Sequence, residues 1–359
     1  MTTQSADDAV LFFIPDIGGF TKFIAETEVR HSQHIVRELL ELLVDANSIG
    51  MKVSEFEGDA VLFYRNGAPP SPQELVQQAR QMYVAFHAYL KKFEYFRVCQ
   101  CGACAGTGGI TLKMVAHYGS AATMQVKDHV KFIGKDIIIA HRLLKNSVDV
   151  REYLLATSQT LLASGGQEID AGSFVRGTDA YESLGTIEYA IRPLEGYRAE
   201  IHVAPPAPGG MTNPRRMATL TRTIDAPIEE VYQRIIDLPG RLDWIEGATR
   251  VDMSGDRENR IGKTHRCMRG EEGVELMTTE VKVSESTMEL WETDLKKIMA
   301  CRYFLTRTPG NATELALELY VRDNLFFRLM FRLLLQKKLT AFFDKSLDNL
   351  CGLFEKAGR

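Results

Sequence analysis

The sequence predicts an α+β protein of two domains, and three observations lead to this class. In the first half, strand-like and helical patterns follow in the order strand, helix, strand, strand, helix, strand. The run APPAPGG at residues 204–210 can form neither a helix nor a central strand, so it predicts a linker. In the second half, many strand-like segments precede one long amphipathic helix. We expect a first domain over residues 1–203, a linker over 204–214 and a second domain over 215–359.

The first domain opens with an apolar run that is too short for a free helix and therefore predicts a buried strand. A helix with apolar residues at helical spacing follows, and then a hairpin. This order fits a ferredoxin-like core with additional elements. The predicted elements are a strand at 9–14, a helix at about 21–43, a hairpin at 52–64, a helix at 72–96, a strand at 110–118, a strand end and helix at 130–144, and strands at 168–174 and 186–193.

The second domain begins with a strand and a helix whose start is marked twice. Asp225 is placed to cap this helix, and Pro227 stands in its first turn. Six further strand-like segments precede the last helix, which is rich in Leu and Phe. The predicted strands are 217–224, 250–253, 262–268, 274–283, 287–291, 301–306 and 312–321, and the last helix covers about 324–356.

Composition and charge exclude several classes of function. The chain is 45% hydrophobic and 25% charged, as is usual for a soluble globular protein, and its net charge of -4 does not indicate a nucleic-acid-binding surface. Residues 1–10 lack the pattern of a signal peptide, and no apolar run is long enough to span a bilayer. We therefore expect a cytoplasmic protein. The basic and apolar stretch 326–338 would look the same as a solvated helix face, so the sequence does not favour a membrane partner.

Two carboxylates stand at the ends of predicted strands. Asp16 lies in the segment FFIPDIGGFT at residues 12–21, and Asp59 lies in EFEGD at residues 55–59. Hard cations prefer oxygen ligands and a nearby phosphate, which two such carboxylates suit. Alternatively, Asp16 caps a helix and Asp59 belongs to a turn. For either residue alone we favour the alternative, but the paired context favours a metal site.

Three motifs of the first domain resemble those of class III nucleotidyl cyclases. Residues 13–21, FIPDIGGFT, resemble the first metal motif, and residues 57–61, EGDAV, resemble the second. Residues 134–143, GKDIIIAHRL, resemble the transition-state segment of that family. Three motifs in the right order are more specific than any one of them, and the resemblance covers about residues 9–193. Since the family's site lies between two domains, the resemblance implies a homodimer that binds a nucleoside triphosphate.

The resemblance also implies roles for individual residues. Asp16 and Asp59 would hold Mg²⁺ or Mn²⁺, with the Ile17 carbonyl as an additional ligand. Arg142 from the partner chain would stabilise charge on the α-phosphate as the catalytic residue. Glycines after Asp16 would let the backbone approach the triphosphate closely. The implied nucleotide-binding residues are Gly18, Gly19, Phe20, Thr21, Glu55 and Lys131.

The chain also departs from the family. The family's Asn falls on Ile138, which donates no hydrogen bond, and one such donor is worth ~2.7–4 kcal/mol in the transition state. The expected phosphate-binding Lys is also missing, since Ser183 stands near that position. Glu55 and Lys131 suit guanine rather than adenine, although they can equally form an ion pair that closes the pocket. We lean towards a cyclase of reduced activity, with a catalytically degenerate binding or signalling module as the alternative.

The cysteine cluster C-x-C-x-x-C offers three thiolates, from Cys99, Cys101 and Cys104. A structural Zn²⁺ site normally needs four protein ligands, and His117 or a cysteine of a second chain would have to complete it. A single run of this kind is a weaker signal than two paired motifs. We therefore favour free thiols in a loop over a Zn²⁺ site.

The second domain resembles the START-like (polyketide cyclase, SRPBCC) superfamily. The resemblance rests on IDAPIEEVY at residues 224–232, followed by LP at 238–239 and LDW at 242–244. It implies a helix-grip fold, in which an antiparallel sheet wraps a long helix around a cavity for a small apolar ligand. Such a domain would sense a ligand for the cyclase-like domain or act as a lipid or small-molecule carrier. The candidate pocket residues are Trp244, Trp291 and Tyr303, with Met277, Leu329 and Phe343 beside them, and ordinary core packing is the alternative for each.

Overall fold

The computed structural model describes residues 9–25, 29–101, 104, 106–165, 174–207, 209–253 and 259–357. The chain divides into two compact units, of which unit 1 is Met1–Lys92 with Ala105–Val203 and unit 2 is Phe93–Cys104 with Ala204–Arg359. The sequence indicated a division only near residue 204, whereas the short segment Phe93–Cys104 also groups with the second unit. The strand predicted at 168–174 lies, except for its last residue, outside the described residues.

The core of unit 1 is an antiparallel sheet whose strands lie in the order β2-β3-β1-β4. β3 therefore lies between the two strands that the first helices connect, which is the split arrangement of a ferredoxin-like core. The predicted order of elements is confirmed. The elements are β1 (Ala9–Gly18), α1 (Phe20–Ala25), α2 (Val29–Asp45), β2 (Lys52–Glu57), β3 (Ala60–Asn66), α3 (Pro72–Phe96), η1 (Thr107–Gly109) and β4 (Thr111–Ser120).

The remaining strands extend this sheet to the order β2-β3-β1-β4-β7-β9-β8, and a separate hairpin, β5 with β6, precedes α5. β7 runs parallel to β4, and the other added pairs are antiparallel. These elements are β5 (Ala122–Val126), β6 (His129–Ile133), α5 (Lys135–Arg142), η2 (Leu143–Lys145), β7 (Tyr153–Thr157), α6 (Ser158–Ala163), β8 (Val175–Tyr181), β9 (Gly185–Pro193) and η3 (Glu195–Glu200).

Alternate side chains of β1 point to opposite faces of the sheet, and one of these faces packs against α5. Val10, Phe12 and Ile14 are buried in one cluster with Ile137 and Ala140 of α5. Because side chains alternate along a strand, Asp16, two positions after Ile14, lies on the same face of β1. The carboxylate of Asp16 is therefore on the face of the sheet that α5 covers.

α5 is fixed on the sheet by a carboxylate in its first turn. Asp136 accepts a hydrogen bond from the backbone N–H of Ser120 at 2.8 Å and contacts His117 Nε2 at 3.0 Å. A side chain at Gly119 would place its Cβ 2.2 Å from the Asp136 carboxyl carbon, so the close approach of helix and strand requires glycine there. The hydrogen bond with His117 is the main cause that lowers the pKa of Asp136. This contact anchors the first turn of α5, the helix that ends at Arg142.

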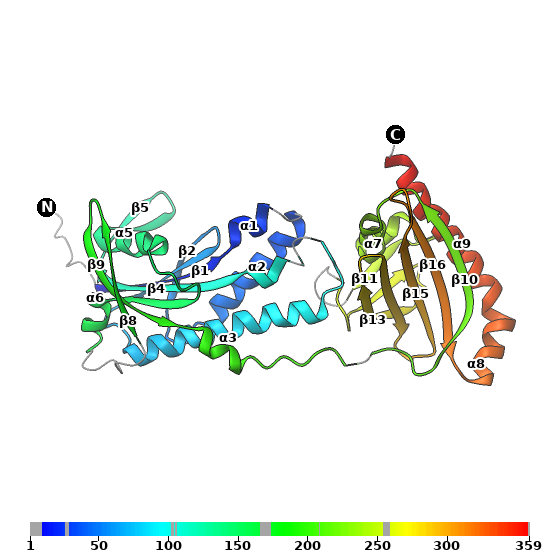
Figure 1. The fold of residues 1–359 in the computed structure, drawn as a ribbon, viewed down its shortest axis with the longest axis horizontal. Coiled ribbons are helices and arrows are strands. Elements are labelled where there is room, and N and C mark those ends of the chain that lie inside the picture. Colours follow the sequence, from blue (N-terminus) through cyan, green and yellow to red (C-terminus); the bar gives the residue numbers. More distant parts are fainter. Residues whose placement is uncertain are drawn as a thin grey trace. The chain divides into compact units, whose positions relative to one another are not determined.

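Unit 2 is a seven-stranded antiparallel sheet in the order β10-β16-β15-β14-β13-β12-β11, followed by a long helix (Figure 1). This is the helix-grip arrangement predicted from the sequence. The elements are β10 (Pro214–Ile224), α7 (Ile228–Ile236), η4 (Pro239–Asp243), β11 (Arg250–Met253), β12 (Thr264–Met268), β13 (Glu275–Val283), β14 (Thr287–Asp294), β15 (Met299–Arg307), β16 (Thr313–Arg322), α8 (Leu325–Met330), η5 (Phe331–Leu335) and α9 (Gln336–Ala357).

The predicted last helix is interrupted. Asn324 caps α8 by accepting from the Phe326 N–H at 2.8 Å, and the π-helical turn η5 separates α8 from α9. α9 is held to β10, because Arg222 pairs with Asp344 at 2.6 Å and with Asp348 at 2.9 Å. Within the described ranges, no helix is both long enough and apolar enough to cross a bilayer.

Candidate functional site

The two predicted metal carboxylates lie at the ends of neighbouring strands. Asp16, near the end of β1, is directly opposite Ala60 on β3. Asp59 precedes Ala60 in the β2–β3 turn, where Gly58 has a φ of 67° that favours glycine. The backbone N–H of Ile17 donates to the Asp59 carbonyl at 3.1 Å, which ties the turn to β1. The structure therefore brings Asp16 and Asp59 together.

The charges of these carboxylates interact. The pKa of Asp59 is raised, first by its burial and second by the negative charge of Asp16. A raised pKa means that the protein around Asp59 does not fully compensate its charge. A divalent cation would supply that compensation, so the two side chains and the nearby backbone oxygens fit Mg²⁺ or Mn²⁺.

In unit 1, the sequence did not indicate Lys113 as part of the site. Lys113 lies opposite Asp16 in the β1–β4 register, and its Nζ is 3.1 Å from Asp16 Oδ2. Nζ also donates to the Leu144 carbonyl at 2.7 Å. The available signal was a single charged residue within the mostly apolar segment 110–116. One lysine beside two carboxylates leaves one negative charge unbalanced.

The glycines after Asp16 have a packing role. Gly19 has a φ of 80°, and a Cβ there would lie 3.0 Å from the Gly109 carbonyl oxygen. A Cβ on Gly18 would lie 2.2 Å from the Thr111 hydroxyl oxygen. Close contact of β1 with the start of β4 therefore requires both glycines. Phe20 and Thr21 follow as the first two residues of α1, a helix of only six residues.

The predicted base-reading residues form an ion pair. Lys131 Nζ on β6 is 3.1 Å from Glu55 Oε2 on β2, and the two side chains are 58% and 33% exposed. A second pair runs beside it, because His141 Nδ1 lies 3.1 Å from Glu57 Oε2. Burial is the main cause that raises the pKa of Glu57, and the nearby His141 opposes it. Both interpretations of Glu55 and Lys131 are compatible with this geometry.

The α5 residues implied in catalysis face solvent. The Arg142 guanidinium is exposed at the end of α5, and it makes no hydrogen bond or ion pair with any described side chain. Its carbonyl accepts from the Tyr181 hydroxyl at 3.2 Å. Ile138, which stands where the family has a donor, is 49% exposed. Within the described part of one chain, Arg142 therefore does not reach Asp16 or Asp59.

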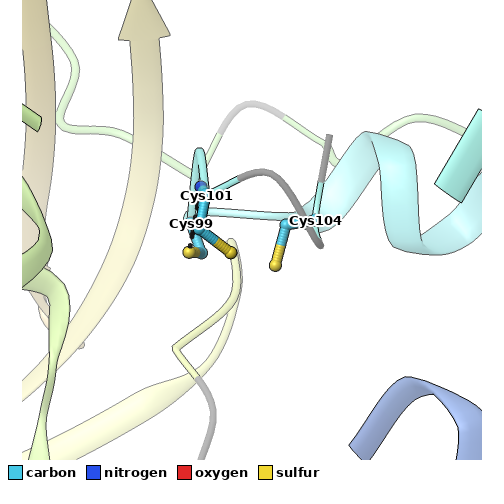
Figure 2. A group of neighbouring side chains, drawn as sticks. All are labelled: Cys99, Cys101 and Cys104. Carbon is cyan, nitrogen blue, oxygen red and sulfur yellow. Dashed lines mark hydrogen bonds between the residues drawn. The ribbon is translucent and has the colours of Figure 1, made fainter. Parts of the chain in front are cut away.

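The three cysteines of the C-x-C-x-x-C run meet in space (Figure 2), with all of their Sγ atoms within 4.8 Å of one another. They belong to unit 2, where the Cys99 thiol donates to Gln233 Oε1 on α7 at 3.2 Å. His117 cannot serve as their fourth ligand, because its Nδ1 contacts the Thr157 hydroxyl at 2.9 Å and its Nε2 contacts Asp136.

Unit 2 also contains a fully buried ion pair. Arg241 and Glu292 side chains, 2% and 0% exposed, form a bidentate pair at 2.6 and 3.0 Å. His265 Nε2 lies 2.9 Å from Arg241 Nη1. Burial lowers the pKa of His265 to about 4, so its ring is neutral at neutral pH. Sequence reasoning did not foresee this cluster, because its members are far apart in the chain.

The predicted ligand-pocket residues separate into two groups. The rings of Trp244 and Tyr303 lie edge to face at 6.4 Å, and both flank the Arg241 guanidinium. Trp291 lies on the opposite face of β14 from Glu292, and its ring packs against Tyr320 at 4.8 Å. Among the buried polar atoms of the described ranges, Trp244 Nε1 and His265 Nδ1 have no hydrogen-bond partner.

Comparisons with family models assign the two halves of the chain differently. Residues 36–153 match a family described as a protein of unknown function (DUF2652). Residues 215–355 match the family described as polyketide cyclase / dehydrase and lipid transport, which confirms the START-like domain. A relative in Mycobacterium tuberculosis, the uncharacterized protein Rv2561/Rv2562, is 37% identical over 120 residues. That alignment covers 33% of this chain and 56% of the relative, so the chain spans just over half of that protein's length.

Several solved structures are similar to about half of the chain. A guanylyl cyclase, Cya2, is 15% identical, with 51% of this chain and 91% of that chain covered and a TM-score of 0.40. The adenylyl cyclase CyaB from P. aeruginosa is 16% identical, with 51% and 93% covered and a TM-score of 0.34. The catalytic core of a rhodopsin-guanylyl cyclase is 17% identical, with 54% and 99% covered and a TM-score of 0.38. All three proteins are named as nucleotidyl cyclases.

Proposed function

We propose that unit 1 binds a complex of a divalent metal ion with a nucleoside triphosphate through Asp16 and Asp59. One observation carries the proposal. The two carboxylates meet at adjacent strand ends, where burial and then the charge of Asp16 raise the pKa of Asp59, and Lys113 supplies a single positive charge. The Ile17 carbonyl, next to Asp16 in the chain, would serve as a further oxygen ligand.

The chemistry proposed for this site is the slow formation of a cyclic nucleotide. The ribose 3′-oxygen attacks the α-phosphorus, its proton is lost, and the bond to the β-phosphate breaks so that pyrophosphate leaves. A Mg²⁺ or Mn²⁺ ion bound there would polarise the α-phosphate. Arg142 of a second copy would stabilise the negative charge on the α-phosphate oxygens, in keeping with its exposed guanidinium, which has no partner among the described side chains.

The expected rate of cyclisation is low because α5 lacks one hydrogen-bond donor, the Asn that the cyclase family has at the position of Ile138. Ile138 is exposed but apolar, and losing one such donor reduces turnover by about 10²–10³-fold. The same residue supports the second candidate function, in which the domain holds a nucleotide and signals by conformation without turnover.

We propose guanine as the preferred base. An ion pair as exposed as Glu55–Lys131 is worth only about 0–1 kcal/mol, so a base edge displaces it at little cost. Glu55 would then accept from guanine N1 and N2, and Lys131 would donate to O6. Adenine instead offers an acceptor at N1 and a donor at N6, and it has no amino group at position 2.

The test is incubation of the full chain with each of the four ribonucleoside triphosphates and Mn²⁺, followed by chromatographic separation of cyclic products. We expect cyclic GMP to exceed the other products and to disappear in Asp59→Ala. If no triphosphate yields a product and Asp59→Ala changes nothing, the catalytic part of the proposal is wrong. Binding of the metal–nucleotide complex would then be judged separately by titration.

For unit 2 we propose binding of a small apolar ligand that carries one hydrogen-bonding group. The observation that favours a polar end is the pair of buried, unpartnered atoms Trp244 Nε1 and His265 Nδ1. Trp244 and Trp291 are the two tryptophans of the chain, so Trp291→Phe leaves Trp244 as the fluorescent reporter. Titration of this variant with lauric acid should shift its emission, and no shift at saturating ligand would contradict the proposal.

A further inference from the structure

We propose that Cys99, Cys101 and Cys104 bind one Zn²⁺ ion in unit 2. None of the three is in a disulfide, although their Sγ atoms lie within 4.8 Å of one another. A tetrahedral site with Zn–S distances of about 2.3 Å places its sulfur atoms about 3.8 Å apart. The cluster therefore needs only a small contraction to hold the ion. This site is separate from the carboxylates of the proposed function.

The fourth ligand is an oxygen. Gln233 Oε1 lies 3.2 Å from the Cys99 Sγ atom and comes from α7, a helix with a buried face. In a tetrahedral site an oxygen ligand lies about 3.6 Å from each sulfur, as follows from Zn–O and Zn–S distances of about 2.1 and 2.3 Å. Binding converts three thiols to thiolates and releases three protons, and the Gln233 amide remains neutral.

The surrounding contacts hold the cysteine segment in place. The Tyr232 hydroxyl of α7 donates to the Val98 carbonyl at 3.0 Å, and the Ile261 N–H donates to the Phe96 carbonyl at 2.9 Å. The backbone N–H of Cys101 donates to the Cys99 sulfur at 3.4 Å. Hydrogen bonds of this kind tune and orient metal thiolates. The ion would thus fasten the segment Phe93–Cys104 to α7, within the unit to which both belong.

Metal analysis of the purified full chain tests this site. We expect about one Zn²⁺ per chain in the wild type and in Cys351→Ser, and almost none in Cys101→Ser. Cys351 is a matched control, because it is a half-buried cysteine on α9, outside the cluster. Gln233→Ala should keep the ion and weaken its affinity about tenfold.

A second readout keeps the proposal testable if Cys101→Ser does not fold. Wild-type protein stripped by a chelator and reloaded with Co²⁺ should show thiolate charge-transfer bands and intense visible bands of tetrahedral Co²⁺. The site would be overturned if the wild type contained no Zn²⁺ and gave no Co²⁺ spectrum. For this result to count, all six cysteines must react with a thiol reagent after denaturation, which shows that they are not oxidised. A disulfide between any two of the three cysteines would also overturn the site.

A different observation, an exposed apolar patch, carries a second proposal. The patch consists of large side chains on α8 and η5, and α8 itself contains no buried residue. Leu325, Leu329 and Leu333 are spaced by four, so they form one stripe along the helix. Patches of this kind mark interaction surfaces. The exposed fractions are 72% for Leu325, 67% for Phe326, 55% for Leu329, 72% for Leu333 and 71% for Leu334.

We infer that this α8 patch docks on an anionic lipid surface. Basic side chains flank it, and one of them, Arg328, pairs with Asp323 at 3.2 Å. Arg332, Lys337 and Lys338 are exposed and, in the described part of the chain, have no acidic partner. An apolar stripe flanked by basic residues is complementary to acidic lipids. Self-association around a two-fold axis would instead bring the same positive charges together.

Flotation of the full chain with vesicles tests the α8 patch. We expect binding to phosphatidylcholine vesicles that contain phosphatidylserine, weaker binding without it, and loss of binding in high salt. The double variant Leu333→Glu/Leu334→Glu should not bind, whereas Leu162→Glu should, because Leu162 is an equally exposed residue on α6 in unit 1. Absent binding by the wild type, or unchanged binding by the double variant, would overturn the proposal. So would a dimer that the double variant dissociates without any vesicle binding.

Discussion

At the scale of single residues, the candidate site of unit 1 is set by an imbalance of charge. Asp16 and Asp59 face one cation, Lys113, and the pKa of Asp59 is raised first by its burial and second by the negative charge of Asp16. The sequence motifs predicted both carboxylates as metal ligands, and the structure places them at neighbouring strand ends. Lys113 was not selected, because its position opposite Asp16 depends on the register of β1 with β4. No short turn joins β1 to β4, so turn geometry could not be used to predict their register from the sequence.

Replacing Lys113 with Met should tighten metal binding. The ammonium group 3.1 Å from Asp16 competes with a cation for that carboxylate. Without it, the affinity for Mn²⁺ should rise about tenfold, since a charge near a half-buried site contributes about 1–2 kcal/mol. Isothermal titration measures the change, with Lys145→Met, an exposed lysine of η2, as the control. Weaker binding by Lys113→Met would show that Lys113 supports the ion instead of opposing it.

Replacing Asp59 with Asn should stabilise the metal-free protein at neutral pH. Because its pKa is raised in the folded state, Asp59 favours folding at low pH and loses that contribution as the pH rises through its folded pKa. Asn cannot ionise, so we expect a Tm increase of about 2 °C at pH 7. The difference should disappear below about pH 4, where the wild-type carboxyl is protonated. Scanning calorimetry across this range tests it, and a lower Tm at pH 7 would contradict it.

At the scale of elements, a buried carboxylate connects α3 to η3. Glu152, 1% exposed, accepts from the Tyr83 hydroxyl at 2.8 Å and from Arg198 at 2.8 Å, and contacts His87 at 2.7 Å. Burial acts to raise the pKa of Glu152, but these hydrogen bonds outweigh it and lower the pKa to about 2. The Glu152 side chain therefore links α3 to η3 within unit 1.

Substituting Glu152 by Gln should destabilise unit 1 by about 2–3 kcal/mol at pH 7, less than for a fully buried pair because Arg198 is half exposed. A lowered pKa stabilises the fold above the ordinary value of 4.5 and loses this effect as the pH falls toward about 2. The difference between variant and wild type should therefore shrink over that interval. Urea unfolding at several pH values measures it, and a pH-independent difference would show that the charge of Glu152 is irrelevant.

The elements themselves were largely predictable from periodicity and turn residues. The ferredoxin-like order of unit 1 and the strands before the last helix of unit 2 follow from patterns within the sequence. The break of the last helix at η5 was missed, because the apolar pattern of 324–356 continues through it. Trp291 and Trp244 were both predicted to line the ligand pocket, because they were chosen by residue type. Residue type alone does not tell on which face of β14 a side chain lies.

At the scale of the whole molecule, the chain passes from one unit to the other more than once. The segment Phe93–Cys104 belongs to unit 2, although unit 1 precedes and follows it in the sequence. Composition predicted a Pro-rich linker near residue 204 but gave no sign of this segment, because the segment's assignment depends on contacts with residues more than a hundred positions away, such as Tyr232. The predicted first domain, residues 1–203, therefore included the cysteine cluster, whereas in the structure the cluster belongs to unit 2.

Assembly of two chains is tested by complementation. If Arg142 of one copy serves the carboxylates of the other, Asp59→Ala and Arg142→Ala proteins should each be inactive. Mixing them should restore about a quarter of wild-type activity, because half of the dimers are mixed and each mixed dimer has one intact site. Product formation measured across mixing ratios checks this. Additive background activity from the two variants would mean that both residues act within one chain.

The central claim, a metal–nucleotide site at Asp16 and Asp59, is tested most directly by titrating Mn²⁺ into the full chain in the presence of GTP, with bound Mn²⁺ followed by electron paramagnetic resonance. The wild type and Asp149→Asn, an exposed carboxylate elsewhere in unit 1, should bind equally well. Asp16→Asn and Asp59→Asn should each lose at least about tenfold in affinity. Undiminished Mn²⁺ binding by both of these variants would contradict the claim.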